Sequence, residues 1–292
     1  MDELKKEDDN VQAWCTLPIP LRESTLTKIF LHAMQDVDKY PALRKNLLSY
    51  AYMSVYPGTF IMFDGIAGSG KSTLLQALKE SFITSGKRVF DIQDWNAQHQ
   101  SPPHINDILE YDVYMLAEPT KTWIGSAIRQ EIAFHPEYYS ARTQAEVFAL
   151  DRMMQYRRVV IPALRLGKTI IQDRGVTTSL VYQSTLDPQL SMQDIAYLAG
   201  NRIALEYAPT HLVLTQIDPS IALARRNNRT DTSKGMYEET ELLRRAQETF
   251  HNQAFYDFMK AHGTSIHTVN TNGDIDSTTT QFLSLIKSFI TL

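Results

Sequence analysis

The chain has 292 residues, of which 43% are hydrophobic and 21% charged, and its formal net charge is −4 at pH 7. This composition is typical of a globular protein, and it gives no general basic field, so we expect no nucleic-acid partner. No apolar run is long enough to span a bilayer, so we expect no membrane contact. The single Cys15 permits neither an intrachain disulfide nor a cysteine zinc site, and the charged N-terminus does not resemble a signal peptide. We therefore expect a cytoplasmic protein.

Helical patterns precede every feature that suggests chemistry. Apolar residues recur at helical spacing over residues 22–37, and Pro41 is well placed to begin a second helix. We interpret residues 1–56 as an N-terminal helical extension, of which roughly the first ten residues are disordered. The Tyr56-Pro57-Gly58 sequence then separates this extension from the first strand.

A glycine-rich loop joins the first predicted strand to the helix after it. Residues 60–63 form a short apolar run that indicates a buried strand, and residues 72–82 favour a helix. Between them lies Gly65-x-x-x-x-Gly70-Lys71-Ser72, the full Walker A pattern in the strand–loop–helix context that it requires. The pattern predicts a site for a nucleoside triphosphate. The residues expected to bind ATP are Gly65, Gly68, Ser69, Gly70, Lys71, Ser72 and Thr73.

Each part of this loop has a physical role in phosphate binding. Glycines allow successive backbone N–H groups to turn inward and form a nest for phosphate oxygens. The helix that follows directs the positive end of its dipole toward the same place. We expect the Lys71 amine to reach the β- and γ-phosphates and the Ser72 hydroxyl to bind Mg²⁺.

The rest of the chain alternates between strand and helix patterns. Further strands are predicted at residues 88–92, 113–117, 168–172, 211–217 and 265–269. Helices are predicted at residues 124–134, 141–166, 178–182, 192–207, 220–227, 239–262 and 277–290. The polar stretch 93–112, with Pro102-Pro103, is interpreted as an inserted loop with room for one short helix. This alternation predicts an α/β fold in which helices cover both faces of a parallel sheet.

Charged residues follow three of the predicted strands. Glu118 follows the third, and Asp173-Arg174 follows the fourth. Because ligands bind at the carboxyl edge of such a sheet, both acids are expected beside the phosphate loop. There, Asp173 could hold Mg²⁺ through water and Arg174 could touch the transferring phosphoryl group. An arginine cluster after the fifth strand, Arg225, Arg226 and Arg229, could neutralise charge that develops on the γ-phosphate. These features together indicate phosphoryl transfer.

From Phe60 onward, the chain resembles the thymidylate kinase family of P-loop nucleoside monophosphate kinases. The matching pieces occur in the family's order: a phosphate loop at 63–73, a Glu-Pro segment at 118–129, a base-facing helix at 148–152, an Asp-Arg segment at 173–183 and a lid at 225–238. The resemblance implies a P-loop kinase domain over residues 57–292, interrupted by the insertion at 93–112. It also implies a homodimer, ATP as co-substrate, Mg²⁺ as cofactor and dTMP as the first-choice acceptor.

The resemblance also implies roles for individual residues. Phe148 would stack on the pyrimidine, and Arg152 would lie beside the base and the acceptor phosphate. Arg129 and Arg174 would bind the acceptor phosphate or the transferring one, and Tyr182 would cover the 2′ side of the sugar. Glu118 would orient the sugar or support the Mg²⁺–acceptor network. The catalytic set is then Lys71, Glu118, Asp173, Arg174, Arg225 and Arg229, with Ser72 and Asp173 at the metal.

Three positions depart from the family pattern, and all of them face the acceptor. Ala67 stands where the family usually has a carboxylate for the sugar 3′-OH. Ala117 stands where an arginine commonly precedes Glu-Pro, and Gly175 stands where a bulky or aromatic residue usually follows Asp-Arg. The departures leave ATP binding intact and leave the acceptor open.

Two other functions fit parts of the sequence. Glu118-Pro119 with Trp123 resembles a segment of the deoxynucleoside kinases, in which the glutamate is the general base for a 5′-OH. Arg129 favours a monophosphate instead, because an acceptor phosphate needs cations. A nucleotide-binding protein without turnover would fit Ala67 and Gly175. The features that argue against it are the intact Lys71, Ser72, Asp173 and Arg174.

Overall fold

The computed structural model describes residues 56–227 and 240–290. The chain divides into two units, Met1–Val55 and Tyr56–Leu292, and all described residues belong to the second. The predicted N-terminal extension therefore lies, except for Tyr56, outside the described residues. The same holds for lid residues 228–238, which include Arg229. Both stay predictions.

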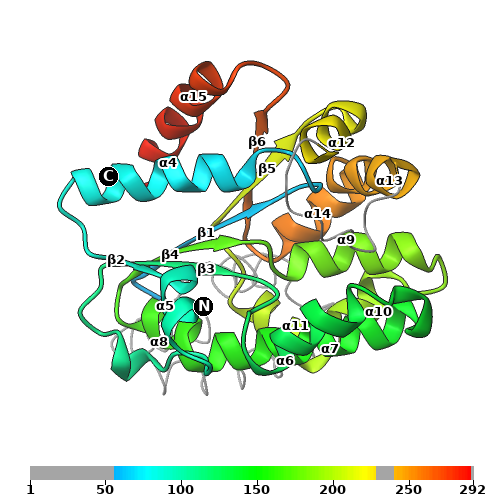
Figure 1. The fold of residues 1–292 in the computed structure, drawn as a ribbon, viewed down its shortest axis with the longest axis horizontal. Coiled ribbons are helices and arrows are strands. Elements are labelled where there is room, and N and C mark those ends of the chain that lie inside the picture. Colours follow the sequence, from blue (N-terminus) through cyan, green and yellow to red (C-terminus); the bar gives the residue numbers. More distant parts are fainter. Residues whose placement is uncertain (1–55, 228–239, 291–292) are drawn as a thin grey trace, which may run out of the picture. The chain divides into compact units, whose positions relative to one another are not determined.

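A six-stranded sheet forms the centre of the second unit (Figure 1). Its strand order is β2-β3-β4-β1-β5-β6, and every neighbouring pair is parallel. The strands are β1 (Thr59–Asp64), β2 (Val89–Asp91), β3 (Val113–Ala117), β4 (Thr169–Asp173), β5 (His211–Gln216) and β6 (Ser265–Asn270). The predicted α/β fold with a parallel sheet is confirmed.

Helices cover both faces of this sheet. They are α4 (Lys71–Thr84), α5 (Ile92–Gln98), α6 (Trp123–Ala127), α7 (Ala141–Gln155), α8 (Ile161–Arg165), α9 (Val176–Leu186), α10 (Met192–Ala196), α11 (Ala199–Glu206), α12 (Pro219–Asn227), α13 (Thr240–Phe250), α14 (Gln253–Ala261) and α15 (Ile275–Lys287). Figure 1 shows α4 and α15 on one face and α7, α9 and α11 on the other. None of the described helices is long and apolar enough to cross a membrane.

The alternation of side chains along β1 explains the two layers. Phe60 and Met62 belong to the core beneath α7 and α9, whereas Ile61 and Phe63 belong to the core beneath α4 and α15. All four are at most 1% exposed. A strand that is buried on both faces has apolar residues at successive positions, and for this reason the sequence predicted a strand at residues 60–63.

Some predicted helices are divided in the structure. Residues 239–262 were expected to form one helix, but α13 ends at Phe250 and α14 begins at Gln253. The side chain of Asn252 accepts a hydrogen bond from the Phe255 N–H at 2.7 Å and caps the second helix, which accounts for the break. Residues 192–207 are likewise divided, into α10 and α11.

The predicted insertion at 93–112 contains the one short helix for which it had room, and a 3₁₀ turn in addition. Its helix α5 begins at Ile92, where the Asp91 side chain accepts a hydrogen bond from the Gln93 N–H at 2.8 Å. A 3₁₀ turn, Ile105–Asp107, follows. The segment before it supplies β2, an edge strand beside β3.

The strand register brings the expected acids to one edge. Asp173 is paired with Phe63 of β1 on one side and with Ala117 of β3 on the other. Asp64 is paired with Leu214 of β5. The residues that follow these strands therefore meet at the carboxyl edge, where the phosphate loop begins.

Candidate active site

The phosphate loop has a backbone that requires glycine. Gly65, Gly68 and Gly70 have φ values of 136°, 81° and 86°, which side-chain-bearing residues rarely adopt. A Cβ on Gly65 would lie 2.2 Å from Oγ1 of Thr215, and one on Gly68 would lie 2.3 Å from the carbonyl oxygen of Ala222. The loop is thus pressed against β5 and α12.

The amine of Lys71 lies inside this loop. Its Nζ donates to the carbonyl oxygens of Gly65 and Ile66 at 3.0 and 2.9 Å, and to Oγ of Ser69 at 3.2 Å. Lys71 is the first residue of α4, whose unpaired N–H groups and positive dipole end add to the charge there. The geometry suits an anion with several oxygens.

A pocket lies beside the loop, and it is lined partly by a turn that sequence reasoning did not identify. Gly68, Gly70 and Thr73 line one side, and residues from the turn after β6, including Thr271 and Gly273, line the other. Arg225 also lines it and donates to the carbonyl oxygen of Thr271 at 2.8 Å. The signal that could have identified this turn is its place directly after a strand, at the same carboxyl edge.

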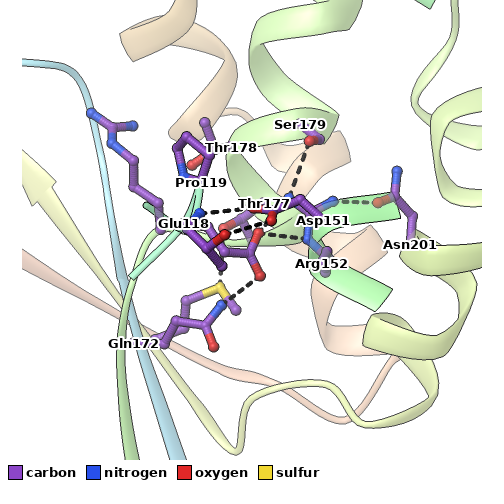
Figure 2. A network of polar contacts seen from close by, with 12 residues as sticks. Glu118, Pro119, Asp151, Arg152, Gln172, Thr177, Thr178, Ser179 and Asn201 are labelled. Carbon is purple, nitrogen blue, oxygen red and sulfur yellow. Dashed lines mark hydrogen bonds and ion pairs between the residues drawn. The ribbon is translucent and has the colours of Figure 1, made fainter. Parts of the chain in front are cut away.

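On the acceptor side, Glu118 and Arg152 form a buried ion pair (Figure 2). Nε and a terminal nitrogen of Arg152 lie 2.8 and 2.7 Å from Oε2 of Glu118. The guanidinium also donates to Oδ1 of Asn201 and, at 3.2 Å, to Oγ of Ser179. Gln172 donates to the other oxygen of Glu118 at 2.9 Å. Arg152 is 1% exposed and Glu118 is 5% exposed, so the pair is almost closed to water.

This environment changes the acidity of Glu118. Burial raises the pKa of Glu118 to about 7, because the charged form loses its hydration, and Arg152 opposes this shift without cancelling it. A carboxyl group that titrates near neutrality at the ligand-binding edge of a sheet is typical of functional sites.

The Glu-Pro segment is held by two more charged groups. Asp151 accepts hydrogen bonds from the N–H and Oγ1 of Thr120 at 2.8 and 2.6 Å. Nε of Arg129 donates to the carbonyl oxygens of Pro119 and Thr120 at 3.1 and 2.9 Å. Burial lowers the pKa of Arg129. Arg129 and Arg152 thus both bind protein groups, and their contacts with an acceptor stay predictions.

The Asp-Arg segment lies next to the phosphate loop. The guanidinium carbon of Arg174 is 5.9 Å from the centre of the Tyr182 ring, which is buried on α9. Phe148 is half-buried on α7, one turn before Arg152. Phe148 and Arg152 thus lie on α7 and Tyr182 lies on α9, and these two helices pack together. Arg129 lies elsewhere, in the π-helical segment Ile128–Ile132.

The two residues predicted to bind the metal ion, Ser72 and Asp173, both offer oxygen ligands. Oδ1 of Asp173 is buried and accepts no hydrogen bond from the described residues. The exposed Ser72 belongs to the first turn of α4. A hydroxyl and a carboxylate are the ligands that Mg²⁺ takes beside nucleotide phosphates, so these two residues fit the predicted cofactor.

Residues 106–281, more than half of the chain, match the family model described as thymidylate kinase. The chain belongs to the thymidylate kinase family. A thymidylate kinase from Anoxybacillus flavithermus is 33% identical over 169 residues, which cover 57% of this chain and 68% of that protein. One from Ligilactobacillus salivarius is 26% identical over 238 residues, which cover 80% of this chain and 99% of that protein. Membership of the thymidylate kinase family confirms the predicted class of enzyme, a phosphotransferase.

The structure explains one departure from the thymidylate kinase pattern. A Cβ on Gly175 would lie 2.4 Å from Cε of Met62 and 2.8 Å from its Sδ. The side chain of Met62, from β1, thus occupies the space that a bulky residue after Asp-Arg would need.

Proposed function

We propose that this protein transfers the γ-phosphoryl group of ATP to dTMP and forms dTDP. The observation that carries the proposal is that the carboxyl ends of β1, β3 and β4 bring a Walker A loop, Glu118 and Asp173-Arg174 to one edge in a thymidylate kinase family member. Catalysis then rests on positioning and charge neutralisation, as suits a loose phosphoryl transition state.

On the donor side, the loop N–H groups and Lys71 hold the β- and γ-phosphates. Ser72, and Asp173 through water, would hold Mg²⁺ there, and the ion would neutralise part of the phosphate charge. Arg225 lies beside the loop and, with Arg229, is assigned to the donor. A Cβ placed on Gly70 would be 3.9 Å from a terminal nitrogen of Arg225, which supports this assignment.

On the acceptor side, Phe148 stacks on the base, Tyr182 lies at the sugar, and Arg174 binds the acceptor or transferring phosphate. Arg129 shapes the Glu-Pro segment and faces the acceptor phosphate. We assign Arg152 chiefly to holding Glu118, since its nitrogens already bind Glu118, Ser179 and Asn201. Arg152 would then lie near the base because it shares a face of α7 with Phe148.

A deoxynucleoside kinase is not favoured. In that class, Glu118 would take a proton from a 5′-OH, but both of its oxygens already accept hydrogen bonds, from Arg152 and Gln172. Trp123, which suggested the alternative, is 50% exposed and lies 5.5 Å from the guanidinium carbon of Arg158. Its ring thus has a partner in the protein.

The direct test is formation of dTDP. The protein is incubated with ATP, Mg²⁺ and dTMP, and nucleotides are separated by ion-exchange chromatography. Equal amounts of dTDP and ADP are expected. Formation of ADP without dTDP would refute dTMP as the acceptor. If the protein binds ATP but forms no ADP with any nucleoside or nucleoside monophosphate, the kinase activity is refuted.

The family resemblance also leads us to propose a homodimer. Light scattering coupled to size exclusion measures the mass directly. A mass near twice that of the 33.3 kDa chain is expected, and a monomer at micromolar concentration would refute the assembly.

A further inference from the structure

Asp64, the last residue of β1, is a buried carboxylate that binds both halves of the site. It is 0% exposed. Its Oδ1 accepts hydrogen bonds from the N–H of Gly65 at 2.8 Å and from a terminal nitrogen of Arg174 at 3.3 Å. Its Oδ2 accepts from Oγ1 of Thr177 and of Thr178, at 2.6 and 2.7 Å.

The backbone of Asp64 continues the connection toward the donor. Its carbonyl oxygen accepts a hydrogen bond from Oγ1 of Thr215 at 3.1 Å. That hydroxyl lies 2.6 Å from Oγ of Ser69, which in turn accepts from the Lys71 amine at 3.2 Å. One residue therefore links the lysine of the phosphate loop to the arginine of the Asp-Arg segment.

The energetics explain why these groups stay together. A carboxylate removed from water is stable only when its oxygens are fully paired. Of the four donors to Asp64, only Arg174 is charged, and the positive end of α9, which starts at Val176, adds to it. Arg174 itself has a φ of 66°, a conformation that a non-glycine residue keeps only when its surroundings hold it.

We propose that Asp64 is a positioning residue for phosphoryl transfer. Its carboxylate binds both the guanidinium of Arg174 and the N–H of Gly65, so it fixes the position of the guanidinium relative to the phosphate loop. Arg174 is thereby held where the γ-phosphoryl group of the bound donor is transferred. This inference rests on the proposed function, because it takes Arg174 as a contact of that group.

The test is a double-mutant cycle on kcat. Asp64→Asn keeps the shape of the side chain but places an amide N–H₂ against donors that need an acceptor. We expect kcat to fall roughly 100-fold, the scale of a misplacement of about 1 Å, while the KM for ATP changes less than about threefold. In an Arg174→Ala background, Asp64→Asn should cost little more, since its effect acts through Arg174.

Thr178→Val is the matched control. It removes one neutral donor to the same carboxylate and leaves Arg174 and Gly65 unchanged, so we expect kcat within about threefold of the wild type. Equal losses from Asp64→Asn in the presence and absence of Arg174 would overturn the inference and indicate a purely structural role. If Asp64→Asn does not fold, Asp64→Glu, which keeps the charge but displaces it, is measured in the same two backgrounds.

The outcomes separate this inference from the proposed function. Turnover of dTMP with independent effects at Asp64 and Arg174 would refute the inference alone. Turnover of another acceptor, with effects that depend on each other, would refute dTMP and support the inference. No turnover with any acceptor would refute both.

Discussion

The two halves of the site are built in opposite ways. The centre of the donor half is one continuous segment, the phosphate loop at residues 65–73, and the contacts of Lys71 there are local, with groups two to six residues away. The acceptor half is assembled from distant segments. Glu118 meets Arg152 across 34 residues, and Asp64 meets Arg174 across 110.

This difference decides how each half uses charge. In the donor half, the Lys71 amine donates to carbonyl and hydroxyl oxygens of the loop, and an anionic ligand can outcompete these neutral acceptors. In the acceptor half, Arg152 and Arg174 pair with carboxylates inside the protein. A change in the donor half should therefore affect chemistry, whereas a change in the acceptor half should affect chemistry and stability together.

The largest effect is expected in the donor half. Lys71→Ala removes the cation at the γ-phosphate and should lower kcat by at least about 1,000-fold. Lys79→Ala is the matched control on the same helix, because Lys79 pairs with Asp91 and Asp94 instead, and its kcat should stay near that of the wild type. Steady-state production of ADP measures both. Turnover that persists in Lys71→Ala would contradict the phosphate-loop mechanism.

In the acceptor half, Arg152→Ala should chiefly affect stability. It leaves Glu118 buried without its charged partner, which costs about 3–5 kcal/mol of unfolding free energy. Urea denaturation measures the loss. Arg157→Ala, at an exposed position five residues further along, should change stability by less than about 0.5 kcal/mol. A stable Arg152→Ala variant whose only defect is a raised KM for the acceptor would reverse our assignment.

The ion pair also predicts a pH dependence. Because burial raises the pKa of Glu118 from 4.5 to about 7, the folded state binds more protons than the unfolded state between these values. Stability from this group is therefore fully present below pH 4.5 and is lost as the pH rises through about 7. Relative to Glu118→Gln, the wild type should lose up to about 3 kcal/mol between pH 4.5 and 8. An unchanged difference across that range would show that Arg152 holds the pKa of Glu118 near or below its ordinary value, and the exposed Glu146→Gln serves as control.

The smallest effect is expected at Trp123. Trp123→Phe keeps an aromatic ring opposite Arg158 and should lower stability by less than about 1 kcal/mol. The KM for dTMP should stay within twofold, because we place no acceptor contact there. A tenfold rise in that KM would restore the nucleoside-kinase interpretation of the Glu-Pro segment.

The same contrast explains what sequence reasoning could find. The donor loop was predictable because a contiguous motif sets its geometry. The central strands β1, β3, β4 and β5 were predictable because they are buried on both faces and are therefore apolar runs. The rule that an acid after a strand marks the site located Glu118 and Asp173, and it applies equally to Asp64, which directly precedes Gly65.

Other parts of the site could not be found in this way. The pairing of Arg152 with Asn201 depends on how closely α11 packs on α7: a Cβ on Gly200 would lie 1.7 Å from the carbonyl oxygen of Ala149. No local pattern specifies such an approach. For the same reason, the sequence did not indicate that arginines assigned to a ligand would also bind carboxylates of the protein.

The most direct test of this account compares dTMP with thymidine as acceptors for the wild-type protein. The two differ only by the phosphate that Arg174 and Arg129 are proposed to bind, and a site built to pair such a group rejects an analogue that lacks it by roughly 10⁴-fold. The account predicts a kcat/KM for dTMP that exceeds that for thymidine by this order. A kcat/KM for thymidine equal to or above that for dTMP would contradict it.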